Sequence, residues 1–243
     1  MKSKLEFIPI KTRHINPPKD DLLPILDESL TDVRDGDIIL FSSKVVSIHQ
    51  GRCIPHEKIT NKDELIITNS DLYIQRNKNS FITVIHNAFS LNAGIDGVRD
   101  YTILLPDNPQ KTAHDFHSHI KKRFSLNNVG IIITDSHSAP LRRGVLGFAV
   151  GFWGINPLYD ASDRKDFSRT TVNIVDTLAG IGNIYMGESQ SKHHPHTPIV
   201  IIRNFTNIEF IEQKNPYNFF LKQEEDLFSP LLKFFRKGKS STE

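Results

Sequence analysis

Residues 129–153 constrain the fold most, because two apolar runs flank a short polar segment. The first run, VGIIIT, is rich in β-branched residues and ends just before Asp135. It has the pattern of a buried strand, and we expect a polar turn to begin at Ser136. The second run, GVLGFAVGFWG, is apolar and rich in glycine, which suits close packing of backbones.

Strand and helix patterns interleave along the rest of the chain without a regular βαβ rhythm. Residues 111–124 repeat apolar side chains at spacings of three and four, as an amphipathic helix does. We expect strands at residues 4–12, 64–70, 80–86, 101–106, 197–204 and 207–213, and further helices at residues 20–30, 172–186 and 224–237. The sequence therefore predicts a mixed α/β (α+β) fold with mixed sheets and two lobes in one domain over residues 1–243, not a P-loop or Rossmann fold.

Composition excludes several classes of protein. The net charge of +2 over 243 residues argues against a protein that binds nucleic acid by bulk electrostatics. No run approaches the roughly 20 apolar residues of a membrane span, and the first residues lack the apolar core of a signal peptide. The single cysteine, Cys53, is expected to be a small buried side chain. We expect a cytoplasmic protein that binds neither nucleic acid nor membrane.

Two aspartates follow apolar or glycine-rich segments. Asp96 ends the segment NAGID, where a carboxylate can bind a hard cation or close an Asx turn. Asp135 follows a buried strand and precedes the hydroxyl of Ser136, a pattern found at Mg²⁺ sites and also at helix N-caps. Together, two short carboxylates after apolar strands suggest metal-assisted phosphate chemistry.

Basic side chains occur in two further turns. Arg142 and Arg143 in PLRRG can bind phosphate or carboxylate, or be a solvated pair. Ser43 and Lys44 in FSSKVVS follow a strand and can contact a phosphate, although an exposed lysine in a turn is the simpler interpretation. Glu188, after MG, is a carboxylate at a helix end, whereas the nearby histidines at 193, 194 and 196 are better explained as a solvated loop.

In chain order, GDIILFSSKVVSIHQGR, NAGID, VGIIITDSHSAPLRRGVLGFAVG, VDTLAG and YMGE…TPIVIIRN resemble the coenzyme F420-0:γ-glutamyl ligase family. The resemblance covers about residues 5–210 and is strongest to a branch described as a folate-metabolism γ-glutamate ligase. It implies a two-lobed homodimeric ligase that uses GTP or ATP with Mg²⁺ or Mn²⁺. It also implies an acyl-phosphate intermediate, which the amine of L-glutamate attacks to form a γ-linked amide.

The resemblance also implies roles for individual residues. Asp96, Asp135, Ser136 and Glu188 match metal-binding positions, and Ser43 and Lys44 match a turn near the nucleotide phosphates. Arg142 matches an arginine that binds phosphate or substrate carboxylate, with Arg143 assisting. We expect Asp135 and Arg142 to be the catalytic pair.

The acceptor and the activity leave alternatives open. The segment TDSHSAPLRRG favours a folate acceptor, tetrahydrofolate monoglutamate, with the deazaflavin coenzyme F420-0 as the alternative. Residues 160–171 lack the glycines typical of the family. A non-catalytic nucleotide-binding scaffold is therefore the rival from another class.

Overall fold

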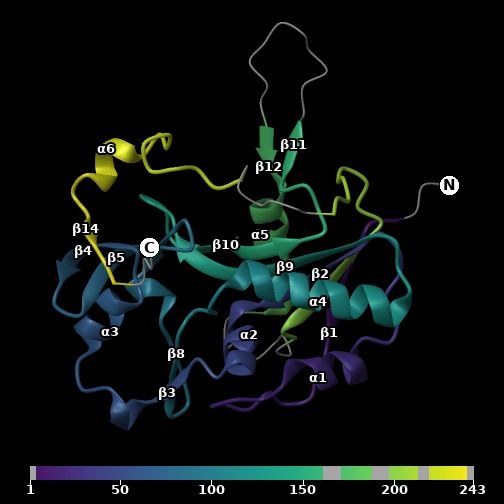
Figure 1. The fold of residues 1–243 in the computed structure, drawn as a ribbon, viewed down its shortest axis with the longest axis horizontal. Helices are drawn as coiled ribbons and strands as arrows, with labels where there is room; N and C mark the ends of the chain where they lie inside the picture. The colour runs from purple at the N-terminus through teal and green to yellow at the C-terminus, as the bar shows by residue number, and fades with distance from the viewer. Residues whose placement is uncertain (1–3, 161–170, 188–196, 213–218, 240–243) are drawn as a thin grey trace, which may run out of the picture.

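Figure 1 shows the fold in a computed structural model of the chain. The structure describes residues 4–160, 171–187, 197–212 and 219–239. Strands of several sheets and helices alternate along these residues, which confirms the predicted mixed α+β class.

A five-stranded mixed sheet forms the centre of the molecule. Its strands, in spatial order, are β1 (Glu6–Ile10), β13 (Ile199–Arg203), β2 (Asp37–Ser42), β9 (Val129–Ser138) and β10 (Val145–Trp153). Only β2 and β9 run parallel to each other, and the other neighbours are antiparallel. This order differs from the parallel, doubly wound sheet of a Rossmann fold.

Helices cover both faces of this sheet because its strands are apolar on both sides. On one face, Ile131 and Ile133 of β9 pack with α1 (Leu22–Ser29), α2 (Ser43–Gln50) and α4 (Pro109–Phe124). On the other face, Ile132 packs with α5 (Ile174–Met186). Figure 1 shows α5 on one side of β9 and β10, with α2 on the other.

Two small sheets and short helices make up the rest of the described chain. One sheet has the order β14 (Arg236–Lys237), β4 (Leu72–Asn77), β5 (Ser80–Ile85), β6 (Ala88–Leu91), and the other has β3 (Cys53–Pro55), β8 (Tyr101–Ile103), β7 (Asp96–Val98). The remaining elements are α3 (Lys62–Thr68), α6 (Ser229–Leu232), the paired strands β11 (Leu158–Asp160) and β12 (Thr171–Asn173), and the 3₁₀ turns His56–Lys58 and Asn92–Gly94.

The strand predicted at residues 64–70 is wrong. Lys62–Thr68 is the helix α3, because the Asn61 side chain accepts a hydrogen bond from the backbone N–H of Glu64 and caps the helix. The apolar run is too short for its period to separate helix from strand.

The long closing helix predicted at residues 224–237 is also wrong. Only Ser229–Leu232 is helical, with Pro230 in its first turn, and the chain then becomes β14. Residues 207–212 contribute one isolated bridge, between Ile155 and Phe210, rather than a strand.

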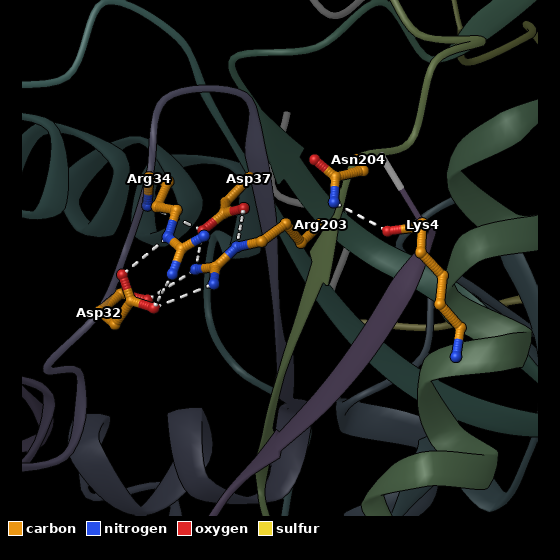
Figure 2. A network of polar contacts seen from close by, with 6 residues as sticks. All are labelled: Lys4, Asp32, Arg34, Asp37, Arg203 and Asn204. Carbon is orange, nitrogen blue, oxygen red and sulfur yellow. Dashed lines mark hydrogen bonds and ion pairs between the residues drawn. The ribbon is translucent and has the colours of Figure 1, made fainter. Parts of the chain in front are cut away.

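A buried ion pair joins β13 to β2 (Figure 2). Arg203 donates through Nε and Nη2 to the two carboxylate oxygens of Asp37, at 3.0 and 2.8 Å. Arg203 is 5% exposed and Asp37 1% exposed, so the pair is removed from water. Hydrogen bonds to Asp37 raise the pKa of Arg203 above its ordinary value. Arg203 also donates to the side-chain carboxylate and to the backbone carbonyl of Asp32, which precedes β2.

In the part of the chain that the structure describes, no helix is long and apolar enough to cross a membrane.

Candidate functional site

The parallel pair β2 and β9 brings the start of α2 beside Asp135. Ser42 ends β2 and is in register with Thr134 of β9, the residue before Asp135. The helix α2 begins at the next residue, Ser43. The turn expected at Ser43 and Lys44 is therefore the start of a helix, and the free N–H groups of this helix start face the edge where β2 and β9 end.

Lys44, in the first turn of α2, contacts Asp96, the other aspartate that the sequence predicts at the site. Its Nζ lies 2.7 Å from Oδ2 of Asp96, the first residue of β7. The Lys44 side chain is 41% exposed and that of Asp96 is 59% exposed, so water and ligands can reach both groups. The structure thus brings Asp96 to Lys44 at the start of α2, although the two residues lie far apart in the sequence.

The β9 strand separates the side chains of Asp135 and Ser136. Ile131 and Ile133 face the α2 and α4 side of the sheet, whereas the hydroxyl of Thr134 donates to Oδ1 of Asn183 on α5 at 2.8 Å. Since side chains alternate along a strand, Asp135 faces the α2 side and Ser136 the α5 side. Consistent with this, Ser136 lines a cavity against α5. The structure does not bring the Ser136 side chain together with that of Asp135.

The hairpin after Asp135 differs from the sequence prediction. The β9 strand continues to Ser138, which pairs with Val145 of β10, so the turn begins three residues later than expected. Pairing with β10 extends the strand through its polar residues, a tertiary effect that local polarity does not reveal. Arg142 and Arg143 lie in the hairpin turn and are exposed.

Ser43 and Cys53 are both buried. Ser43 is 5% exposed and is the first residue of α2. Cys53 packs in the core on β3, which confirms the expected buried side chain, and burial raises the pKa of its thiol.

Glu188 and the histidines at 193, 194 and 196 lie outside the described residues.

Sequence reasoning missed Asn183, which supports Asp135 from α5. The Asn183 side chain accepts from Thr134 and donates to the backbone carbonyl of Asp135 at 3.0 Å. Asn183 is 8% exposed, so both hydrogen bonds are shielded from water and fix the position of β9 against α5. The only sequence signal is a polar residue within the apolar pattern of residues 172–186.

Asp176 supports the neighbouring strand in a similar way. Its carboxylate accepts from the backbone N–H of Ala149 at 2.8 Å and from the Asn173 side chain at 2.5 Å. Asn173 caps α5 in return through the N–H of Asp176. Asn173 is therefore the N-cap of α5, and its amide exchanges hydrogen bonds with Asp176.

The donor chemistry of Asp96 and Asp135 fits a divalent cation. Carboxylate oxygens are the ligands that Mg²⁺ prefers, and such sites use one or two carboxylates together with waters and substrate phosphates. Within the residues that the structure describes, no group of three or more His, Cys, Asp or Glu side chains is arranged for a metal ion. A metal held by Asp96 and Asp135 would leave coordination positions for oxygen atoms of water and of the substrates.

Basic and acidic groups at the ends of buried strands, next to a helix start, are typical of the class of enzymes that transfer phosphoryl groups between anions. Comparison with known proteins narrows this class to the amide-forming γ-glutamyl ligases. The family model described as F420-0:Gamma-glutamyl ligase matches residues 9–204, and the chain belongs to this family.

Several curated relatives are similar over most of their length. The "Coenzyme F420:L-glutamate ligase" of Methanocaldococcus jannaschii is 33% identical over 220 residues, covering 81% of this chain and 86% of the relative. The protein of the same name from Methanococcus maripaludis strain S2 is 31% identical, covering 93% of this chain and 97% of the relative. The Methanopyrus kandleri protein of that name is 29% identical, covering 82% and 86% respectively.

Proposed function

We propose that this chain is one two-lobed ligase domain that joins L-glutamate to a deazaflavin acceptor of the F420-0 type, with GTP as the phosphoryl donor. The single observation that carries the proposal is the contact between Lys44 and Asp96 beside the start of α2, next to the strand that carries Asp135. Phosphoryl transfer to a carboxylate needs cationic groups and helix N–H groups at the phosphates, with acidic groups for a metal.

The chemistry proceeds in two steps. A carboxylate oxygen of the acceptor first attacks the terminal phosphorus of the nucleotide, and the nucleoside diphosphate leaves. The amine nitrogen of L-glutamate then attacks the acyl carbon of the resulting acyl phosphate. Inorganic phosphate leaves with the former carboxylate oxygen, and the amine loses a proton as the amide forms.

Lys44 and the start of α2 bind the nucleotide phosphates in this proposal. The ammonium of Lys44 is exposed enough to contact a phosphate and remains within reach of Asp96. Ser43 contributes its backbone N–H at the helix start, because its side chain is buried. Arg142 binds the terminal phosphate or the substrate carboxylate, and Arg143 assists, because arginines in an exposed turn can reach a ligand bound at the sheet edge.

Asp96 and Asp135 would hold Mg²⁺ or Mn²⁺, which when bound neutralises phosphate charge during transfer. Ser136 and Glu188 remain proposed ligands from the family resemblance. The face of β9 that carries Ser136 makes its side chain the weaker of the two β9 candidates.

The choice of acceptor changes from the sequence-based expectation. The segment around Arg142 favours folate, but the named relatives are ligases of coenzyme F420 and L-glutamate. We therefore propose the deazaflavin acceptor and keep folate as the alternative outcome.

Mass spectrometry of the reaction products tests the proposal. Purified protein is incubated with L-glutamate, Mg²⁺, GTP or ATP, and either F420-0 or tetrahydrofolate. A glutamyl mass increment on F420-0 with GTP is the expected result. An increment on tetrahydrofolate alone would overturn the acceptor, and faster reaction with ATP would overturn the nucleotide. Nucleotide binding without an increment on either acceptor would favour the non-catalytic scaffold.

We further propose that the ligase is a homodimer. Apolar side chains are exposed on the β9–β10 hairpin and on the end of α5: Leu141, Val145, Leu146, Ile184 and Tyr185. Exposed apolar groups of this kind are typical of protein interfaces. Light scattering is expected to give twice the chain mass for the wild type, and a monomer mass for Leu146→Lys. A monomeric wild type would refute the dimer.

A further inference from the structure

The C-terminal segment, residues 219–239, connects the five-stranded sheet to the small sheet of β14, β4, β5 and β6. It starts on the five-stranded sheet and ends as the edge strand β14 of the small sheet. In Figure 1 this yellow segment passes through α6 and returns to β4. We call it the C-terminal strap.

Aromatic contacts fix the first end of the strap. The Phe219 ring packs edge-on against Phe152 of β10, with centroids 5.2 Å apart, and Phe220 lies 5.2 Å from Phe219. Phe152 is fully buried, so the strap begins on the core of the large sheet.

Backbone hydrogen bonds fix the other end. Arg236 and Lys237 pair with Tyr73 and Leu72 of β4. The N–H of Gly238 donates to the carbonyl of Asp71 at 2.8 Å. Between the two ends, Phe228 and Phe235 contact the ring of Phe89 on β6.

A cavity of about 600 Å³ lies between the strap and the two sheets. This volume is within the range of small-molecule sites. Aromatic rings line it from both sides, with Phe148 on β10 and Phe219 and Phe220 on the strap. Phe148 is in register with Asp135, so the cavity adjoins the strand that carries the proposed catalytic aspartate.

Charge decides what kind of ligand suits the cavity. Among the described residues that line it, Asp71, Asp176 and Asp226 carry carboxylates and Lys237 carries an ammonium. A phosphate or carboxylate group is repelled by this lining, whereas a flat ring with N–H or O–H donors on its edge is attracted. Anionic groups are better placed outside, near Lys44, Arg142 and Arg143.

We propose that this cavity binds a planar heteroaromatic ring, which stacks on the strap through Phe220 and donates hydrogen bonds to the carboxylates. This proposal rests on the proposed function, because it assigns a ring of one of that reaction's substrates to the cavity. The ring belongs either to the acceptor or to the nucleotide base. The strap lies beyond residue 204, where the family match ends, so this wall of the site is not part of the matched region.

Calorimetric titration of the full chain with ring fragments tests the proposal without requiring turnover. The probes are a deazariboflavin, pteroate and guanosine, none of which carries a phosphate. The test variants are Phe220→Ala and Leu221→Ala, which alter the cavity wall. Matched controls are Phe234→Ala and Leu231→Ala, on strap residues that are 73% and 56% exposed and do not line the cavity.

At least one probe should bind the wild type, and Phe220→Ala should weaken its binding about tenfold, as expected for loss of a stacking ring. Leu221→Ala, at a side chain that is 56% exposed, should weaken binding several-fold without risk to folding. Both controls should bind as the wild type does. Loss for deazariboflavin or pteroate assigns the acceptor ring, and loss for guanosine assigns the base.

Two outcomes would overturn the proposal: no probe binds the wild type, or the cavity variants bind every probe as well as the controls do. A protein that adds glutamate but shows either result would refute the ring site alone. A protein that binds a ring through Phe220 but adds no glutamate would refute the proposed function and leave the ring site standing.

Discussion

The ammonium of Lys44 lies 2.7 Å from the carboxylate of Asp96, although the two residues belong to different elements, α2 and β7. Both side chains are partly exposed, and an exposed pair of this kind adds little to stability. A lysine held in the first turn of a helix is, by contrast, well placed to meet an anion. We therefore expect the pair to contribute more to ligand binding than to folding stability.

The first prediction concerns Lys44→Ala. Removing the ammonium should lower kcat/KM on the order of 100-fold, as loss of one charged donor at a transition state does, with little change in melting temperature. Lys111→Ala is the matched control, because Lys111 forms an exposed pair with Asp115 at 2.6 Å on α4. Steady-state kinetics and thermal melts of both variants check this. Equal activity of the two variants would remove Lys44 from the site.

Asp135→Asn is the second prediction. The amide retains the size of the side chain but loses the charge, so turnover should fall below detection while the folded structure persists. The hydrogen bond that Asn183 accepts from Thr134 and the one that it donates to the backbone carbonyl of Asp135 do not involve the carboxylate and should remain. Glutamate incorporation and circular dichroism measure the two effects, with Asp115→Asn on the exposed face of α4 as control. Wild-type activity in Asp135→Asn would show that the metal assignment is wrong.

The apolar runs predict the central strands correctly, because a strand that is buried on both faces must be apolar along its length. The period of residues 111–124 predicts α4, which the structure places at Pro109–Phe124. By contrast, α3 is decided by the cap at Asn61, and the end of β9 by pairing with β10. Those are effects of local hydrogen bonding and tertiary pairing, which hydrophobic pattern does not contain.

In the candidate site, too, the sequence predicts some features and only the structure reveals others. Residue type and strand ends point to Asp96, Asp135 and Lys44, and the structure joins two of them directly. The opposite orientation of Ser136 follows from the pleat of a strand that extends further than its apolar part. The strap cannot be read from the sequence, because Phe219 and Phe220 contact partners more than 60 positions away.

A third prediction concerns the buried pair of Figure 2. Arg203→Met leaves the carboxylate of Asp37 buried without its main cation, which should cost about 3–5 kcal/mol of unfolding free energy. The control Arg123→Met removes a partly exposed pair with Asp27 and should cost much less than Arg203→Met. Urea denaturation measures both. The double variant Asp37→Leu with Arg203→Met should recover part of the loss, and a loss as large as that of Arg203→Met would contradict this account.

The fourth prediction is a pH dependence of stability that arises from His117. Burial lowers the pKa of His117 to about 4, against an ordinary value near 6.5, with Lys121 and His114 acting in the same direction and Glu212 opposing them. The unfolded chain therefore binds a proton first as the pH falls. Stability due to neutral His117 is complete above pH 6.5 and is lost between pH 6.5 and 4, by about 2–3 kcal/mol.

Urea denaturation of His117→Gln between pH 7 and 4.5 checks this contribution. The variant should lose stability less steeply than the wild type as the pH falls, while the exposed His56→Gln keeps the wild-type slope. His49 and His86, whose pKa values burial also lowers, leave a residual slope of the same sign. Identical slopes for His117→Gln and the wild type would rule out this role.

The last prediction tests how the strap is attached. A Cβ at position 238 would lie 1.8 Å from the carbonyl oxygen of Ser70, a backbone atom that cannot yield as a flexible side chain does. Gly238→Ala should therefore release β14 from β4 and disrupt the bond from residue 238 to the carbonyl of Asp71. Hydrogen exchange of residues 229–239 should accelerate at least tenfold, while α5 remains protected as in the wild type. Gly97→Ala is the control, because nothing lies within 4 Å of its added Cβ. Unchanged exchange at Arg236 and Lys237 in Gly238→Ala would mean that close approach to Ser70 does not hold the strap in place.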